Sequence, residues 1–202
     1  RLARLLADQR RPVQILLAGK AHPADEAGKD VIQHVVDFAR SAEGTGRVVF
    51  LADYEMTLAC RLVQGCDVWL NTPRRPMEAS GTSGMKAALN GVLNCSILDG
   101  WWAEGYTPER GFAIGDETSA ASDEEQDAAD AEALFAVLEQ QVVPVYYERD
   151  ASGVPVRWTE LMRHSIAELG VMFSTTRMVE EYVERMYLPA DRSALAGASE
   201  AA

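Results

Sequence analysis

The sequence has 202 residues, of which 48% are hydrophobic, so a single domain with a sizeable core is expected. Its 31 acidic and 19 basic residues give a formal net charge of -12. Nucleic acids and anionic membranes bind clustered Lys and Arg, so this balance argues against both as partners. No apolar run approaches the roughly 20 residues that a membrane-spanning helix needs.

The cysteines and the acidic residues have ordinary structural explanations. Cys60, Cys66 and Cys95 lie among apolar neighbours and show neither a metal-binding spacing nor the even count of a disulfide framework. We therefore expect reduced core thiols and a cytoplasmic protein. Between residues 116 and 132, eight of seventeen residues are Asp or Glu, which predicts a solvated loop and helix face.

The first half of the chain alternates short β-rich runs with helical periods, a pattern typical of parallel βαβ units. A helix is expected at the start, because Leu2, Leu5 and Leu6 recur on one side. The predicted strands are residues 13–19, 47–52, 66–71 and 92–99. Between them the apolar spacing predicts helices around residues 31–39, 58–63 and 82–90, the second of them capped by Asp53. The fold class is therefore α/β, with a Rossmann-like parallel sheet and flanking helices.

Beyond residue 99 the pattern becomes mainly helical. We expect a turn at residues 100–106, a short extended segment at 112–115 and helices at about 124–142, 157–169 and 175–187. The Ala- and Ser-rich residues 189–202 read as a flexible tail. The expected division is thus one folded unit over residues 1–188, followed by this tail.

The segment around residues 72–91 contains the densest group of chemically useful residues. Residues 72–81 include two prolines and a glycine, so they form a loop at the carboxyl end of a strand, where open α/β sheets bind ligands. The small residues 79–84 allow a ligand to approach closely, and helix N-terminal amides attract phosphate. Lys86 can face the same pocket, and Glu78 can accept hydrogen bonds from hydroxyl groups. On composition alone, an ordinary helix-capping loop remains the alternative.

The order of these residues identifies a family. Residues 78–86, Glu-Ala-Ser-Gly-Thr-Ser-Gly-Met-Lys, closely resemble the cofactor signature of the glycogen, starch and maltodextrin phosphorylases. The resemblance continues in residues 18–21, 47–54 and 89–91, and in Leu98-Asp99-Gly100. It implies the carboxy-terminal part of a bacterial-type α-glucan phosphorylase, cut from a longer enzyme. The fold so implied is a partial carboxy-terminal lobe of a two-lobed, GT-B type glycosyltransferase, without its first strands and helices.

The resemblance also implies a cofactor and a place for each of its parts. In these enzymes the lysine of the Met-Lys pair forms a Schiff base with pyridoxal phosphate, a role that carries over to Lys86. The matching positions imply that Thr82 and Ser83 bind the phosphate of the cofactor. By the same resemblance, Tyr54 flanks the cofactor ring.

The reaction implied is phosphorolysis of the terminal α-1,4 bond of a glucan, which releases glucose 1-phosphate. Glu78, Ser80 and Gly81 match the positions that hold hydroxyls of the transferred glucose. The expected partners are the α-glucan, inorganic phosphate and the missing amino-terminal lobe of the same enzyme, with a homo-oligomer left open. The basic phosphate-binding segment and the glucose-binding histidine of the family are absent here, so this chain alone is expected to be inactive.

For several residues the sequence leaves two roles open. Arg74 and Arg75 have the right charge for phosphate, although a loop-surface position is favoured. Trp101 and Trp102 either stack on a glucan ring or cap the core. No metal site is expected from the three histidines, His22, His34 and His164. Of these, His22 is a weak candidate for lining a pocket.

Two other functions remain as alternatives to a phosphorylase. Retaining nucleotide-sugar glycosyltransferases carry a glutamate that holds the sugar and a second glutamate, facing the ribose, eight positions later. The eighth position after Glu78 is Lys86, which cannot accept hydroxyl hydrogens, so this reading is disfavoured. The other alternative is a non-catalytic α/β module that keeps the pocket for binding.

Overall fold

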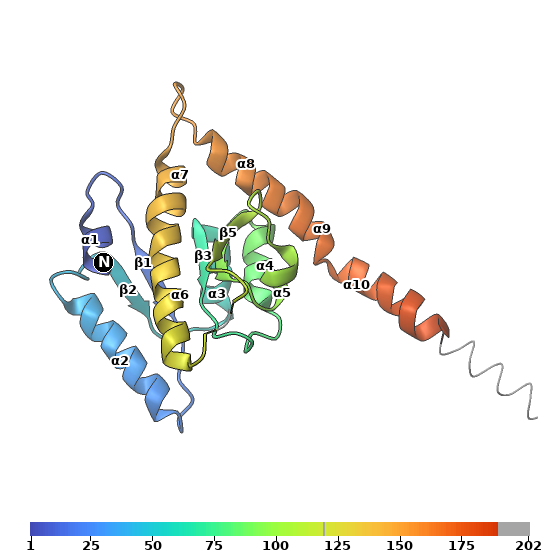
Figure 1. Ribbon diagram of the computed structural model, residues 1–202, viewed down its shortest axis with the longest axis horizontal. Coiled ribbons are helices and arrows are strands. Elements are labelled where there is room, and N and C mark those ends of the chain that lie inside the picture. The colour runs from blue at the N-terminus through green and yellow to red at the C-terminus, as the bar shows by residue number, and fades with distance from the viewer. Residues whose placement is uncertain (119, 190–202) are drawn as a thin grey trace, which may run out of the picture.

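The computed structural model describes residues 1–118 and 120–189 (Figure 1). It contains five strands in two parallel sheets. In the first sheet β1 (Ile15–Ala18) pairs with β2 (Val48–Leu51), and in the second β3 (Val68–Asn71), β4 (Leu93–Ile97) and β5 (Gly111–Ile114) pair in that order. The α/β class with parallel strands and the predicted strands are confirmed, although the strands form two sheets and not the one that was expected. The extended segment expected at residues 112–115 corresponds to β5, which ends at Ile114. The tail expected at residues 189–202 lies, from residue 190 on, outside the described residues.

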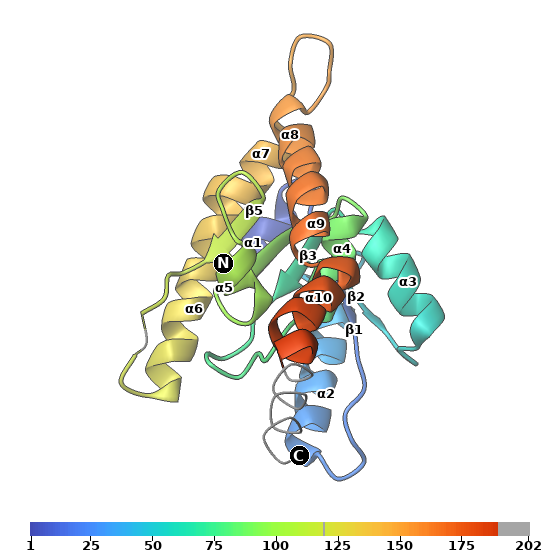
Figure 2. The ribbon, with the colours of Figure 1, turned by 90° about the vertical axis from the view of Figure 1, so that its right-hand side faces the viewer.

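In the first half, α1 (Leu2–Ala7) precedes β1. The next helices follow β1 to β4 in turn: α2 (Glu26–Arg40), α3 (Met56–Gly65), α4 (Thr82–Leu89) and α5 (Trp101–Gly105). The later helices form two long rods that include π-helical turns: α6 (Asp123–Val137), η1 (Leu138–Val142) and α7 (Val143–Tyr147), then α8 (Val156–His164), η2 (Ser165–Leu169) and α9 (Gly170–Met172). A last helix follows, α10 (Thr175–Tyr182) with η3 (Val183–Tyr187). Figure 2 shows α6 and α3 on opposite sides of the strands, so helices cover both faces.

The start of α3 differs from the prediction. Glu55, and not Asp53, caps this helix, because its carboxylate accepts hydrogen bonds from the backbone N–H groups of Thr57 and Leu58, both at 3.0 Å. The bond from Thr57, followed by that from Leu58, lowers the pKa of Glu55. Asp53 instead has a φ of 54° in the turn after β2, a left-handed conformation that Asp tolerates better than most residues.

Strand β4 lies at the centre of the main core. All five of its residues are buried, as expected for a parallel strand with helices on both faces. One cluster joins β4 and β5 to the long helices on one side. It comprises Leu93, Cys95, Ile97, Phe112, Ile114, Val137, Val142, Val145, Trp158 and Leu161.

A second cluster settles the alternatives for the two adjacent tryptophans. Residues 101–105 form the short helix α5 rather than a plain turn, and Trp101 and Trp102 are only 4% and 0% exposed. The indole N–H of Trp102 donates to the carbonyl oxygen of Phe112 at 3.1 Å. Both rings pack with Ala88 and Leu169, so in this structure they belong to the core and leave no face for a glucan ring.

The expectation of core thiols is correct for Cys95 and wrong for Cys60. Burial raises the pKa of Cys95 to about 12, so its thiol stays protonated. Cys66 is partly buried, and burial raises its pKa as well. Cys60 is exposed, although its neighbours in sequence are apolar. Successive helical residues point in different directions around the axis, so apolar sequence neighbours do not guarantee burial.

We predict that Leu93→Ala lowers the free energy of unfolding of this chain by about 2–5 kcal/mol, since Leu93 is fully buried in the main cluster. The control, Leu16→Ala on β1, removes a side chain that is 46% exposed and should cost less than about 1 kcal/mol. Urea denaturation of both variants measures the difference. Equal losses would contradict the placement of the core on β4.

Candidate functional site

The N-terminus of α4 is the most distinctive feature of the segment that the sequence singled out. Helices α2, α3, α6 and α10 are each preceded by a residue whose side chain caps them, whereas α4 follows Gly81, which has a φ of 94° and provides no side-chain cap. The starts of α1, α5 and α8 also lack a side-chain cap, so this feature alone does not distinguish α4. In the described part of the chain, the backbone N–H groups of Thr82 and Ser83 have no acceptor. Free amides at a helix start attract an anion, and phosphate suits them well.

Lys86 lies one turn into the same helix. Its side chain is exposed, and among the described residues its amine has no hydrogen-bond or ion-pair partner. Because Thr82 is four residues earlier, both side chains project from the same face of α4. An amine and a row of free amides thus lie within one helical turn. This arrangement fits a ligand that combines an anionic group with an aldehyde.

The loop before α4 is fixed to the turn that follows β4. The carboxylate of Asp99 accepts a hydrogen bond from the backbone N–H of Glu78 at 2.9 Å. The backbone N–H of Trp101 donates to the carbonyl oxygen of Ser80 at 2.8 Å. Between them, Gly100 has a φ of 52°, and a Cβ there would lie 2.7 Å from the Ser80 carbonyl oxygen. Residues 78–80 therefore have a defined position at the carboxyl edge of the sheet.

The carboxylate of Glu78 keeps much of its capacity to accept hydrogen bonds. It receives only long contacts, from the side-chain amide of Asn71 at 3.5 Å and from the backbone N–H of Ser80 at 3.4 Å. A carboxylate has about four lone-pair directions, so acceptor positions remain for sugar hydroxyls.

Asn71 and Asp99 are residues to which the sequence reasoning assigned no role. Asn71 is the last residue of β3, and Asp99 follows the end of β4 by two positions. Polar residues that follow neighbouring parallel strands meet at one edge of the sheet, and this spacing is a signal that would have found them.

The two arginines of the loop have different surroundings. Arg74 forms ion pairs with Asp123 and Asp127 of α6, at 2.8 and 2.6 Å, so its charge is balanced locally. This contact agrees with a loop-surface role and places part of the acidic segment against the loop. Arg75, in contrast, has a buried Nη1 atom without a hydrogen-bond partner among the described residues.

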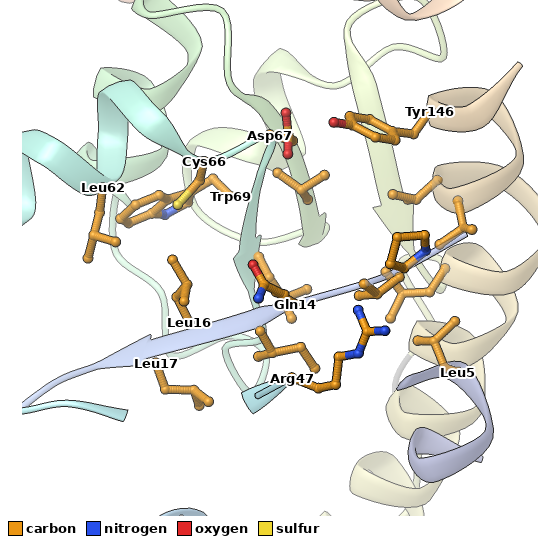
Figure 3. Close-up of a pocket in the computed structure, with 18 of the residues that line it drawn as sticks. Leu5, Gln14, Leu16, Leu17, Arg47, Leu62, Cys66, Asp67, Trp69 and Tyr146 are labelled. Atoms are coloured by element: carbon orange, nitrogen blue, oxygen red, sulfur yellow. The ribbon is translucent and has the colours of Figure 1, made fainter. Parts of the chain in front are cut away.

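A groove of about 870 Å³ lies between β1 and β3 (Figure 3). All four residues of β1 and residues 67–70 around β3 line it. Consecutive strand residues point to opposite faces, so a groove lined by consecutive residues runs along the edges of the two strands. Tyr54 lines this groove, whereas Lys86 and the Glu78 loop do not. The cofactor role of Tyr54 stays a prediction.

The described residues offer little for metal or membrane chemistry. They hold no group of three or more His, Cys, Asp or Glu residues placed to bind a metal ion. His22 accepts a hydrogen bond from the backbone N–H of Ala24 and does not line the groove, and His164 contacts Glu168. No helix in the described part of the chain has the length and apolar character to cross a membrane.

Comparison with known proteins shows which protein family this chain resembles. The family model for carbohydrate phosphorylase matches residues 2–137, which include β1 to β5 and the start of α4. Glycogen phosphorylases of Mycobacterium tuberculosis (strain H37Rv) and Aquifex aeolicus are 51% and 49% identical to the chain over 193 and 187 residues. The maltodextrin phosphorylase of Thermococcus litoralis is 46% identical over 195 residues.

These matches cover nearly the whole chain but only a part of each relative. They include 96%, 93% and 96% of this chain, and 22%, 27% and 23% of the respective relatives. The chain therefore spans about a quarter of the length of the curated relatives that it matches. The matched family model and these identities show that the chain belongs to the carbohydrate phosphorylase family and corresponds to one part of such an enzyme.

Proposed function

We propose that this chain is the carboxy-terminal part of an α-glucan phosphorylase that releases glucose 1-phosphate from terminal α-1,4 bonds with inorganic phosphate. The observation that carries the proposal is the uncapped N-terminus of α4 with Lys86 one turn inside it. Membership of the family supports it, as do relatives named for glycogen and maltodextrin. The nucleotide-sugar alternative is disfavoured because the exposed amine of Lys86 cannot accept hydrogen bonds from a ribose.

The cofactor that we propose is pyridoxal phosphate, held covalently by Lys86. Thr82 and Ser83 would bind its phosphate through backbone amides, and the partial positive charge at the start of α4 would stabilise the dianion. When bound, the cofactor supplies a phosphate group that serves as proton donor or electrostatic partner to the substrate phosphate. Tyr54 remains our proposed neighbour of the cofactor ring.

The sugar would be held by the loop that precedes α4. Glu78 has free acceptor positions for glucose hydroxyls, and Ser80 and Gly81 are our proposed sugar-binding residues beside it. The hydrogen bond from the Glu78 N–H to Asp99 keeps this loop in place before the substrate arrives. Such preorganisation lowers the cost of orienting the glucose for attack.

The groove supports our proposal that residues 1–188 are an incomplete carboxy-terminal lobe of GT-B type. In the described structure β1 pairs only with β2, and β3 pairs only with β4. Each strand therefore has an open edge along the groove, and a native protein normally covers such edges. We propose that strands of the longer enzyme fill this space and that its amino-terminal lobe closes the site. The three free thiols favour a cytoplasmic location.

If the full-length parent carries pyridoxal phosphate, we expect the covalent group on Lys86 and on neither of the other lysines of this chain, Lys20 and Lys29. The amine of Lys29 is already bound by Glu26 and by the carbonyl oxygen of Pro23. Borohydride treatment followed by peptide mapping locates the group. A pyridoxyl group found chiefly on Lys20 or Lys29 would show that the assignment is wrong.

In the same full-length enzyme, Glu78→Gln should lower the rate of phosphorolysis roughly tenfold to a hundredfold while cofactor content stays near normal. A hydrogen bond to a charged group contributes about 1.5–3 kcal/mol, and the Glu78→Gln variant would lose this stabilisation of the transition state. Glu104→Gln, at an exposed position of α5, is the matched control and should change neither quantity. Wild-type turnover of the Glu78→Gln variant would remove Glu78 from the site.

The 202-residue chain alone should have no measurable phosphorylase activity, even with saturating pyridoxal phosphate. Two adjacent phosphate dianions repel by several kcal/mol in a partly dry site, and helix amides offset only about 1–2 kcal/mol. The open groove also admits water, which weakens the remaining electrostatic contacts. Release of glucose 1-phosphate from maltoheptaose is the assay, with the full-length enzyme beside it. Turnover of the isolated chain within tenfold of the full-length enzyme would show that the rest of the enzyme is not needed for activity.

A further inference from the structure

Asn94 is a buried polar residue in the middle of the core that the reaction described above does not use. It lies on β4, is 1% exposed, and its side-chain N–H donates to the carbonyl oxygen of Gly84 at 3.1 Å. Its Oδ1 atom has no hydrogen-bond partner among the described residues. Burying an amide with an unpaired oxygen is unfavourable, and an apolar side chain would avoid that cost. The bond that Asn94 does make is to the first turn of α4.

Trp101 contacts the same turn with its ring. A Cβ at Gly81 would lie 2.7 Å from Trp101 Cδ1, and a Cβ at Gly84 would lie 2.9 Å from Trp101 Nε1. Both distances are too short for a side chain, so the indole rests directly against the backbone at these two glycines. Trp101 is itself held in an edge-to-face contact by Phe173, with ring centroids 5.1 Å apart.

The two contacts together determine where α4 begins. A Cβ at Gly84 would also come within 2.6 Å of Asn94 Oδ1, so the helix start is enclosed by both side chains. A shift of the helix towards β4 or α5 would cause overlap, and a shift away would break the bond between Asn94 and Gly84. The free amides of Thr82 and Ser83 and the amine of Lys86 belong to this same short helix.

We propose that Asn94 and Trp101 are positioning residues of the cofactor site. They hold the first turn of α4 so that its amides and the Lys86 amine meet one ligand in a single orientation. This inference rests on the proposed function, because it concerns how the pyridoxal phosphate site is kept in place. Neither residue touches the cofactor or the substrate in this role.

The test uses the full-length parent with Trp101→Leu and Asn94→Leu. The matched control is Trp102→Leu, since Trp102 is equally buried in the same cluster but its indole bonds to Phe112 of β5. We expect both test variants to raise the dissociation constant for pyridoxal phosphate at least tenfold. In the cofactor-saturated enzyme, kcat should fall at least tenfold and KM for the glucan should change less than twofold. The Trp102→Leu control should lose thermal stability while cofactor affinity and kcat stay within about threefold of wild type.

Two outcomes would overturn the inference. One is cofactor affinity within twofold of wild type in both test variants, and the other is an equal loss of affinity in Trp101→Leu and Trp102→Leu. If Trp101→Leu does not fold, Asn94→Leu decides alone, because it removes one amide at nearly constant size. A wild-type parent without cofactor on Lys86 would instead reject the proposed function, so the two failures are distinguishable.

Discussion

Burial of β4 on both faces is the constraint on which the rest of the structure depends. Its five residues are enclosed by β3 and β5 at the sides and by helices above and below. The same strand supplies the residues that hold the proposed ligand-binding edge, with Asn94 as its second residue and Asp99, Gly100 and Trp101 just after its end. Any change that loosens β4 therefore reaches both the core and the loop before α4. Stability and site geometry have a common origin in this fold.

Electrostatics at the proposed site depend on local pairing more than on net charge. The chain carries a formal charge of -12, yet the first turn of α4 presents free amides, and the amine of Lys86 one turn later has no partner among the described residues. The acidic helix α6 contacts the loop before α4 through Arg74, whose exposed ion pairs contribute little to stability but balance the charge. An anion can therefore approach α4 although the protein as a whole is acidic.

The two sheets are joined by packing rather than by strand pairing in the described structure. The long rod formed by α6, η1 and α7 crosses beside both sheets in Figure 1, and residues of η1 and α7 line the groove between them. This arrangement leaves two strand edges facing a shared space, which is consistent with a chain that spans about a quarter of its relatives. The same incompleteness explains why we place activity in the longer enzyme and not in this chain.

The sequence by itself determined the order of strands and helices and the segment in which we propose the chemistry to take place. Residues 82–90 were predicted as a helix and form α4, because local periodicity and a run of small residues are properties of neighbouring positions. Residues 78–86 could be recognised for the same reason, since the motif is contiguous. The amine at Lys86 and the free amides of the helix start follow directly from that order.

Only the tertiary structure decided which side chains face the core and which contacts hold the site. In the folded chain Trp101 and Trp102 are buried and Cys60 is exposed. The cap of α3 is Glu55 and not Asp53, and Arg74 forms ion pairs whereas Arg75 forms none among the described residues. The fold also brings Asn94 and Trp101 to the glycines of α4. These contacts depend on how each helix or strand is oriented about its own axis and on residues that are distant in sequence. Local periodicity cannot specify them, because the packing partners are chosen only when the chain folds.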